Sequence, residues 1–499
     1  MIGELIAKFV TSHDRSVHRG LEILPGAFSW TLILFPLWGS FWVPHYVAYF
    51  VILFDIFWFY KSGTLAVTVV LSHIKIRAAE RYSWMNDLKK LPDWKKIHHV
   101  VIIPTFKEPE LTLEKGLDSI AMQDLGPKYI SVVLAMEERE AGALEKGTKL
   151  KKKYESVFAN FFITMHPDIE GEVKGKSSNE AWAGKWVKKE LIDRKKMDIE
   201  YMTVTSKDAD AILHKKYYSC LSYKFLTNPE RHYRFWQAAI MFYSNIWRIP
   251  APIRVVNTFC TLWQTAQLMR KDRIINYSTY SLSMKMLDEV GYWDVDVIPE
   301  DYRLFFKSYF CLNGKVEVEP VFLSVHADAA EASGYINTMI NQYEQMKRWA
   351  WGASDDAYII KNWMINHQIP FWKRTMRVIK VLEDHFLWPV NWFVITLGAN
   401  IPLILNPKFS QTVLGTNLPK ITFGLMTLAW VFLVVMIIVD FRQRPKSDVP
   451  ISPIKRMLMP LEFILMPVTG LFFSALPGLD AHTRLMLGKY IEYRVTEKV

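Results

Sequence analysis

Two aspartates that lie two residues apart form the first candidate site. Asp208 and Asp210 stand in "SKDADA", at the end of a stretch over 198–210 that predicts a strand. Residues two apart on an extended chain face the same side. Two carboxylates on one side can bind Mg²⁺ or Mn²⁺ through oxygen, and the cation would then bridge them to a diphosphate. A single D-x-D is also typical of a solvated acidic turn. The pattern therefore favours a metal site only in combination with the other motifs of the chain.

A second acidic pair follows a proline. Glu300 and Asp301 stand in "VIPEDYRLF", directly after Pro299, where a helix is predicted to begin. A helix N-terminus stabilises carboxylates, so capping alone explains the pair. The alternative is a general base, because glycosyl transfer needs an acceptor hydroxyl that loses its proton as it attacks the anomeric carbon.

A third group combines an amide, a guanidinium and an indole. On a helix, Gln345, Arg348 and Trp349 occupy positions i, i+3 and i+4 and share one face. A sugar ring can stack on the indole, and the guanidinium fork matches phosphate oxygens. The group therefore suits a site where a sugar meets a diphosphate. An amphipathic helix at a membrane surface is the alternative, with the tryptophan as an interfacial anchor.

Weaker candidates lie at the ends of other predicted elements. Lys176 and Asn179 stand where a helix opens, and backbone amides at such a position attract phosphate. Thr105 and Glu108 follow the first predicted strand, and Glu137 ends the second. These side chains either line a nucleoside pocket or are ordinary turn residues.

Strands and helices alternate through the middle of the chain. The expected strands are 98–105, 131–137, 161–167 and 198–210, and the expected helices are 110–123, 142–155, 177–191 and 211–225. This alternation predicts an α/β fold with a mostly parallel sheet, whose ligands bind at the carboxyl ends of the strands. Each candidate group above lies at such an end.

Long apolar runs flank this middle region. They cover roughly 27–43, 46–74, 386–405, 421–439 and 457–476. Each is about long enough to cross a hydrocarbon core of ~30 Å as a helix, which predicts a multi-pass membrane protein. Asp55 and Lys61 lie in the second run and are functional candidates if they are inside the membrane. The alternative is that this helix ends near Tyr60.

The positions of lysine and arginine predict the orientation. Basic residues are frequent over 1–24 and 75–90, whereas the loop 39–45 has none. This pattern places the middle region in the cytoplasm, with the apolar runs in the plasma (inner) membrane. The last run contains Pro467 and Gly470. It either crosses fully, which puts the basic tail outside, or is a broken re-entrant segment that keeps the tail inside.

The net charge of +11 fits anionic lipid and an anionic substrate. Nucleic acid is not expected, because the basic residues cluster at the ends of the spans, where orientation already explains them. The three widely spaced cysteines fit a reducing compartment and no zinc motif.

The order D…DxD…ED…QxxRW, on a domain between apolar helices, resembles the family-2 glycosyltransferases. Within that family it is similar to the processive membrane branch of cellulose, chitin and hyaluronan synthases. The motifs cover about 100–352. The resemblance implies a GT-A fold, an inverting transfer, a nucleotide-diphosphate donor that is typically UDP-linked, and a divalent metal.

The resemblance also implies roles for individual residues. Asp208 and Asp210 match the ligands of the metal and the diphosphate, and Asp301 matches the catalytic base. The motif at the acceptor and the diphosphate is matched by Gln345, Arg348 and Trp349. The implied donor-binding residues are Thr105, Glu108, Glu137, Lys176, Asn179 and Asp208.

The whole chain is then expected to have six parts. They are an N-terminal cytoplasmic segment (1–24), two transmembrane helices (25–75), a GT-A domain (98–355), interfacial amphipathic helices (356–385), two to three transmembrane or re-entrant helices (386–477) and a C-terminal tail (478–499).

Two acceptors fit this organisation. The first is a growing polysaccharide, and because four or five spans are few for a closed channel, a homo-oligomer or an accessory export subunit would complete it. The second is a lipid, such as a polyprenyl phosphate or a glycolipid, that receives one sugar. A non-catalytic scaffold is a third interpretation, which the intact Asp208, Asp210 and Asp301 disfavour.

Overall fold

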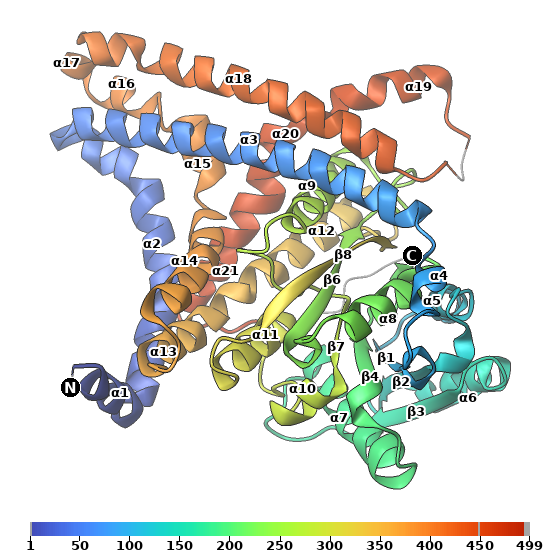
Figure 1. Cartoon of the computed structure of the whole chain (residues 1–499). Coiled ribbons are helices and arrows are strands. Elements are labelled where there is room, and N and C mark those ends of the chain that lie inside the picture. Colours follow the sequence, from blue (N-terminus) through green and yellow to red (C-terminus); the bar gives the residue numbers. More distant parts are fainter. Residues whose placement is uncertain (1, 448–449, 494–499) are drawn as a thin grey trace.

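The computed structural model describes residues 2–447 and 450–493, without the side chains of Ile2, Glu4 and Lys455. Residue 1, residues 448–449 and the last part of the predicted tail, 494–499, lie outside the described residues. An α/β domain at 98–355 packs beside a frame of long helices (Figure 1).

The α/β domain is built on one eight-stranded sheet with the order β3-β2-β1-β4-β7-β6-β8-β5. The strands are β1 (His98–Thr105), β2 (Ile130–Glu137), β3 (Asn160–His166), β4 (Met202–Ser206), β5 (Ile212–Leu213), β6 (Arg234–Met241), β7 (Tyr280–Ser283) and β8 (Glu317–His326). The first four strands are parallel, β7 is antiparallel to both of its neighbours, and β6 is parallel to β8. The predicted fold class, a mostly parallel α/β sheet inserted between apolar helices, is confirmed.

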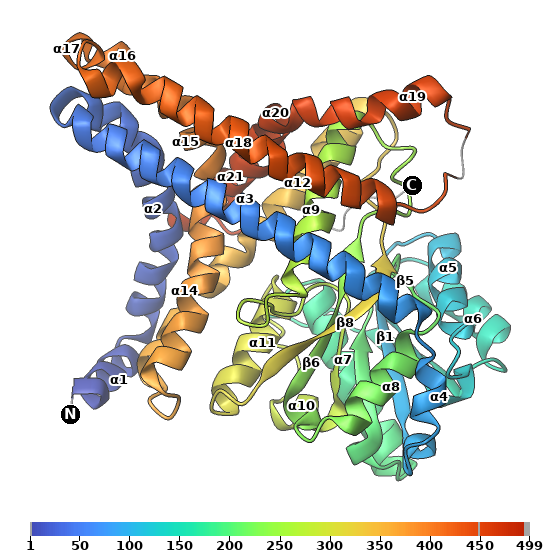
Figure 2. The ribbon, with the colours of Figure 1, turned by 45° about the horizontal axis from the view of Figure 1, so that its top comes forward.

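The helices between these strands cover the sheet. They are α5 (Glu110–Ala121), α6 (Ala143–Tyr154), α7 (Lys176–Val187), α8 (Tyr217–Thr227), α9 (Ala251–Gln267), α10 (Met284–Glu289), α11 (Glu300–Cys311) and α12 (Tyr335–Ala350). Every residue of β1, β2 and β4 is buried, so helices must close both faces (Figure 2). Strands buried on both faces read as continuous apolar runs, which is why they were predictable.

Two predicted boundaries were wrong. The fourth strand is shorter than 198–210, because the Asp198 side chain accepts a hydrogen bond from the Glu200 amide and starts a 3₁₀ turn before β4. The helix expected from residue 211 begins at Tyr217, because Ile212 and Leu213 pair with β8 as β5.

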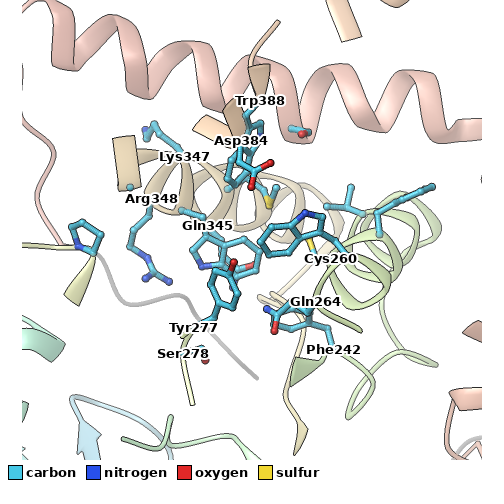
Figure 3. A pocket seen from close by; sticks show the side chains of 18 of the residues that line it. Phe242, Cys260, Gln264, Tyr277, Ser278, Gln345, Lys347, Arg348, Asp384 and Trp388 are labelled. Carbon is cyan, nitrogen blue, oxygen red and sulfur yellow. The ribbon is translucent and has the colours of Figure 1, made fainter. Parts of the chain in front are cut away.

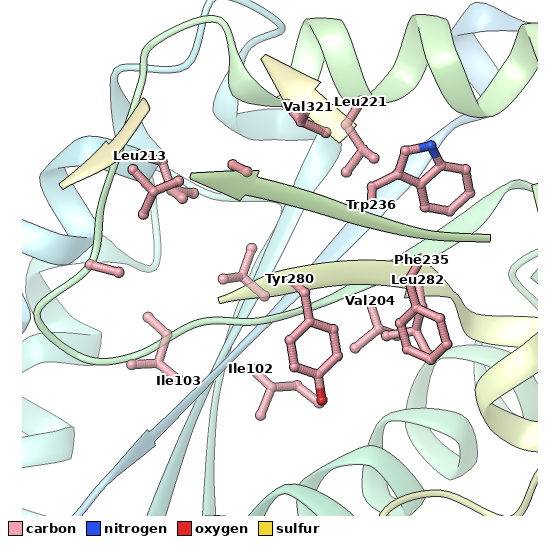
Figure 4. Packing of buried hydrophobic residues seen from close by; sticks show 14 of the residues in the cluster. Ile102, Ile103, Val204, Leu213, Leu221, Phe235, Trp236, Tyr280, Leu282 and Val321 are labelled. Carbon is pink, nitrogen blue, oxygen red and sulfur yellow. The ribbon is translucent and has the colours of Figure 1, made fainter. Parts of the chain in front are cut away.

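The core of the sheet is aliphatic and aromatic. Ile102, Val204 and Leu282 lie on three neighbouring strands and are fully buried, as is Trp236 on β6 (Figure 4). Each such side chain contributes about 1.5–3 kcal/mol by leaving water. This packing holds the strand ends in fixed positions, and the loops that follow them carry the site.

Within the described residues, four helical segments are long and apolar enough to cross a membrane: α2 (Asp14–Trp42), α3 (Pro44–Arg81), α18 (Val413–Gln443) and the segment Arg456–Met486. They indicate an association with a membrane. The long helices α3 and α18 lie side by side (Figures 1 and 2). Because α3 continues to Arg81, the alternative that this helix ends near Tyr60 was wrong.

The apolar run 386–405 is not one straight helix, contrary to the prediction. It is divided among the end of α14 (Phe371–Leu387), α15 (Asn391–Leu397) and α16 (Ile401–Leu405). Pro389 and Pro402 stand at the two breaks, where a missing N–H interrupts the helical hydrogen bonds.

The last apolar segment is interrupted as well. It consists of α19 (Pro453–Leu458), a 3₁₀ turn (Met459–Leu465), α20 (Met466–Gly470), a π turn (Leu471–Ala475) and α21 (Leu476–Met486). Prolines stand at the first or second position of four of these pieces, and three of them, Pro460, Pro467 and Pro477, lie where the helix type changes inside the segment.

Candidate active site

One cavity of about 1580 Å³ contains the residues that the motifs predicted. It lies between the carboxyl ends of the central strands and the long helices, and Figure 3 shows part of its wall. The predicted residues that line it are Thr105, Glu108, Glu137, Lys176, Asn179, Asp208, Asp210, Asp301, Gln345, Arg348 and Trp349. Residues spread over 245 positions of the sequence therefore face one space, although contact with a ligand stays a prediction for each.

A buried lysine joins three elements at the floor of this cavity. The Lys176 Nζ at the start of α7 lies 2.8 Å from the Asp208 carboxylate after β4 and 2.9 Å from the Glu300 carboxylate of α11. Burial alone would lower the pKa of Lys176, but the two carboxylates outweigh it and hold the pKa well above its usual value. Lys176 is thus a permanent cation between the Asp208–Asp210 pair and the Glu300–Asp301 pair.

Ser278, which the sequence did not indicate, connects the same groups. Its backbone N–H donates to the Asp301 carboxylate at 2.9 Å, its hydroxyl donates to Asp208, and its carbonyl accepts from Lys176 at 2.8 Å. Its φ of +53° is uncommon for a residue with a side chain. Such strain persists only where the surroundings fix it, often at functional sites. No local pattern in "NYSTY" could have revealed this role, because its three partners come from distant segments.

The Asp301 carboxyl is held by two backbone amides, those of Ser278 at 2.9 Å and Tyr302 at 2.8 Å. Burial, and then the neighbouring charge of Glu300, raise the pKa of Asp301 to about 7. A carboxyl with a pKa near neutrality is suited to accept a proton in a reaction at neutral pH.

The two aspartates after β4 offer oxygen ligands to a hard cation. The Asp208 carboxylate contacts Lys176 and Ser278, and the Asp210 carboxylate accepts from the Asp328 amide at 2.8 Å. Within 2–447 and 450–493, no three His, Cys, Asp or Glu side chains form a metal-binding group. Mg²⁺ usually takes one or two protein carboxylates and completes its shell with water and phosphate, so this pair fits such a cation together with a diphosphate.

The residues after β1 and β2 line another part of the cavity. The Thr105 hydroxyl donates to the Glu108 carboxylate at 2.6 Å, and Glu137 pairs with Arg139. The Arg139 guanidinium lies 3.8 Å from the centre of the Phe106 ring. Arg139 and Phe106 were not predicted, and they add a flat surface on which a base can stack.

Asn179 is oriented by the sheet. Its side-chain N–H donates to the Ala135 carbonyl of β2 at 2.8 Å, and its Oδ1 is buried without a hydrogen-bond partner. The amide oxygen can therefore accept a hydrogen bond from a ligand.

The last predicted group lies on α12, on the other side of the cavity (Figure 3). Gln345 is buried and accepts from Gln342 at 3.3 Å, and Trp349 packs against Phe242 with 5.6 Å between ring centres. The Arg348 guanidinium lies 5.4 Å from the centre of the ring of Tyr493, which is the last described residue. All three residues line the cavity, as do their neighbours Glu344, Met346 and Lys347, so the shared role of the three stays a prediction.

A cluster of four paired charges lines the cavity at the level of the long helices. It consists of Lys61, Arg273, Glu383 and Asp384, and we call it the collar. Lys61 on α3 lies 2.5 Å from Glu383 on α14. Arg273 lies 3.1 Å from Glu383 and 2.6 Å from Asp384. The collar thus links a candidate membrane span to the α/β domain.

Comparison with known proteins gives only distant structural similarity. No protein-family model and no curated protein matches the sequence. Among solved structures, a mannosyltransferase from Pyrobaculum calidifontis in complex with GDP-Man and Mn²⁺ has a TM-score of 0.42 and 13% identity, over 76% of this chain and 100% of that one. S. aureus TarS residues 1–349, in complex with UDP, has a TM-score of 0.36 and 11% identity, over 72% and 95%. With TM-scores and identities this low, the activity of these proteins cannot be assigned to this chain. The proposal below is therefore based on the side chains of the site.

Proposed function

We propose that this protein is a membrane-associated, inverting glycosyltransferase with a GT-A domain, which uses a nucleotide-diphosphate sugar. One observation carries the proposal: Asp301, Asp208 with Asp210, and Arg348 with Trp349 line a single cavity at the carboxyl ends of parallel strands. A base, an anion site and a sugar-stacking surface are the parts that glycosyl transfer needs, and they come from three separate segments. UDP-sugars are the first donors to test.

In the proposed reaction, Asp301 accepts the proton of the acceptor hydroxyl as its oxygen attacks the anomeric carbon. A new C–O bond forms, the bond to the nucleotide diphosphate breaks, and the configuration inverts. The permanent charge of Arg348 favours the leaving diphosphate, and the face of Trp349 orients the acceptor sugar. One base suffices, because no covalent intermediate is formed.

The cation in this proposal is Mg²⁺ or Mn²⁺, held by Asp208 and Asp210. When bound, it would neutralise the charge that develops on the leaving diphosphate. Because Asp208 and Asp210 would fill only part of the coordination shell, we expect UDP to tighten Mn²⁺ binding about tenfold, a typical coupling between two ligands. Calorimetric titration of Mn²⁺ with and without UDP measures this. The Asp210→Asn variant should lose the coupling, whereas equal affinity in both titrations would contradict the assignment.

Two acceptors are compatible with this site. The motif resemblance favours a growing polysaccharide, and the alternative is a single transfer to a lipid. The apolar helices support an acceptor at the membrane, with the α/β domain in the cytoplasm. No nucleic acid is involved in either case.

The test uses the full-length protein in lipid nanodiscs with Mg²⁺ or Mn²⁺. A panel of UDP- and GDP-linked sugars is screened for release of the nucleotide diphosphate and for transfer of labelled sugar. Asp301→Asn keeps the size of the side chain but removes the base, and should lower transfer by about 10²-fold or more. Transfer at the normal rate by this variant would refute the proposed chemistry, and a failure of every donor would refute the class.

A further inference from the structure

The two ends of the cavity differ in chemistry. The end in the α/β domain is lined by the charged residues described above. The other end lies beyond the collar, among α3, α9, α15, α18 and α20. Its lining is mostly apolar, with Leu65, Phe259, Ile395 and Leu433 among its members, and it also includes the hydroxyls of Thr68 and Thr396.

The apolar end closes inside the helical frame. Within the described residues, the lining residues are Trp58 and later positions on α3, Met426 and later positions on α18, and positions up to Thr396 on α15. The space beyond is filled by a second apolar cluster that includes Phe54 and Val394. Figure 1 shows α2, α3 and α18 converging at this side of the molecule. Within the described residues, the lining of the cavity therefore ends at this cluster in one copy of the chain.

The boundary between the two ends is suited to a polar head group. In the collar, two cations and two carboxylates pair with each other, so they offer hydrogen bonds without a net charge. Trp388 lines the same region, and its indole Nε1 is buried without a hydrogen-bond partner. A hydroxyl or phosphate oxygen at this level would accept that bond.

A polysaccharide does not match this shape, because it carries hydroxyls along its whole length. Most hydroxyls that entered the apolar end would lose water without gaining a partner, because only a few side chains there, such as those of Thr68 and Thr396, can bond them. An amphipathic molecule matches it well. Its hydrocarbon chain would lie beside α18, its head group at the collar, and its reacting hydroxyl or phosphate toward Asp301.

We propose that the acceptor is lipid-linked, with its hydrocarbon chain in the apolar end of the cavity. This inference rests on the proposed glycosyl transfer and names the class of its acceptor. A polyprenyl phosphate and a glycosylated diacylglycerol share the required chemistry.

The experiment compares two tryptophan substitutions on α18. Ala429 lines the cavity, so Ala429→Trp should fill the space for the chain. Val431 is 60% exposed and lies outside the lining, so Val431→Trp is the matched control. Each protein is placed in nanodiscs that contain either undecaprenyl phosphate or glucosyl diacylglycerol. The labelled product is then divided into a butanol phase, a water phase and an ethanol-insoluble fraction.

We expect the label in the butanol phase, with one sugar on each acceptor, and the better of the two lipids identifies the head group. Ala429→Trp should reduce this transfer about tenfold or more, the effect of overfilling a packed site. Val431→Trp should stay within about twofold of the unmodified protein, as surface changes usually do. Met426→Trp, which fills the same end from one turn earlier, replaces Ala429→Trp if that variant does not fold.

Three results would overturn the inference. They are an ethanol-insoluble polymer as the main product, lipid transfer that Ala429→Trp leaves unchanged, and release of nucleotide diphosphate with no label on either lipid. In the first two of these the proposed glycosyl transfer still stands, because labelled sugar has been transferred. In the third the donor is cleaved, so the donor site stands but transfer to these lipids does not. If no donor of the panel is consumed, the proposed function itself fails.

Discussion

At the scale of single residues, the electrostatic environment of Asp301 sets the pH range in which this carboxylate can act as a base. The elevated pKa comes from burial and from Glu300, and the two amides and Lys176 oppose it only in part. A base must be deprotonated to act, so the pH dependence has a definite sign. The transfer rate should rise as the pH increases through about 7 and level off above it. A rate profile from about pH 5.5 to 8.5 measures this. A rate that is flat, or that falls over this range, would remove Asp301 from the role of base.

Ser278 provides a second prediction at this scale. Both Ser278→Ala and Ser278→Gly remove the hydroxyl that orients Asp208, a hydrogen bond to a charged group that contributes about 1.5–3 kcal/mol. Both should therefore reduce kcat about tenfold or more. Only glycine relieves the positive φ, by about 1 kcal/mol, so Ser278→Gly should unfold at a higher temperature than Ser278→Ala. Unchanged kcat in both variants would show that the serine has no part in positioning the site.

At the scale of elements, the collar couples α3 to α14. Lys61→Met leaves Glu383 with Arg273 as its remaining partner, and we expect a loss of about 1–3 kcal/mol, because the pair is largely buried. Lys61→Arg keeps the charge and should recover most of this loss. Thermal unfolding in nanodiscs measures the effect.

The matched control for the collar is Lys90→Met. Lys90 pairs with Asp87 at 2.6 Å, but its side chain is 75% exposed, so its removal should change stability by less than about 1 kcal/mol. If Lys61→Met is as mild as this control, the collar does not hold the helices to the domain.

At the scale of the whole molecule, the orientation of the α/β domain can be read from a native cysteine. Cys311 is an exposed thiol at the end of α11, Cys220 is buried, and Cys260 is half-buried. If the domain is cytoplasmic, a membrane-impermeant maleimide should label Cys311 only after cells are opened, and Cys311→Ser should remove that signal. Labelling of Cys311 in intact cells would place the domain outside.

The sequence by itself determined the class of fold and indicated which groups are candidates for the reaction. The buried strands were visible as continuous apolar runs, because both faces of β1, β2 and β4 are covered. The acidic pairs and the Arg348–Trp349 group were visible because each is a short local pattern. Ser278 was not visible in this way, because its three partners are distant in the sequence: one follows β4 and the others lie on α7 and α11. The breaks at Pro389 and Pro402 were not visible either, since an apolar run looks the same whether it is straight or divided.

Only the tertiary structure decided what these groups face. It brought residues from β1 to α12 to one cavity. It also buried Asp301 beside Glu300, which raises the pKa of the Asp301 carboxyl. It also decided that the cavity ends among the long helices, because Phe54, Val394 and Leu418 pack across its far side. Hydropathy measures how apolar each helix is, but whether helices enclose an open path or a blind space depends on which side chains meet between them.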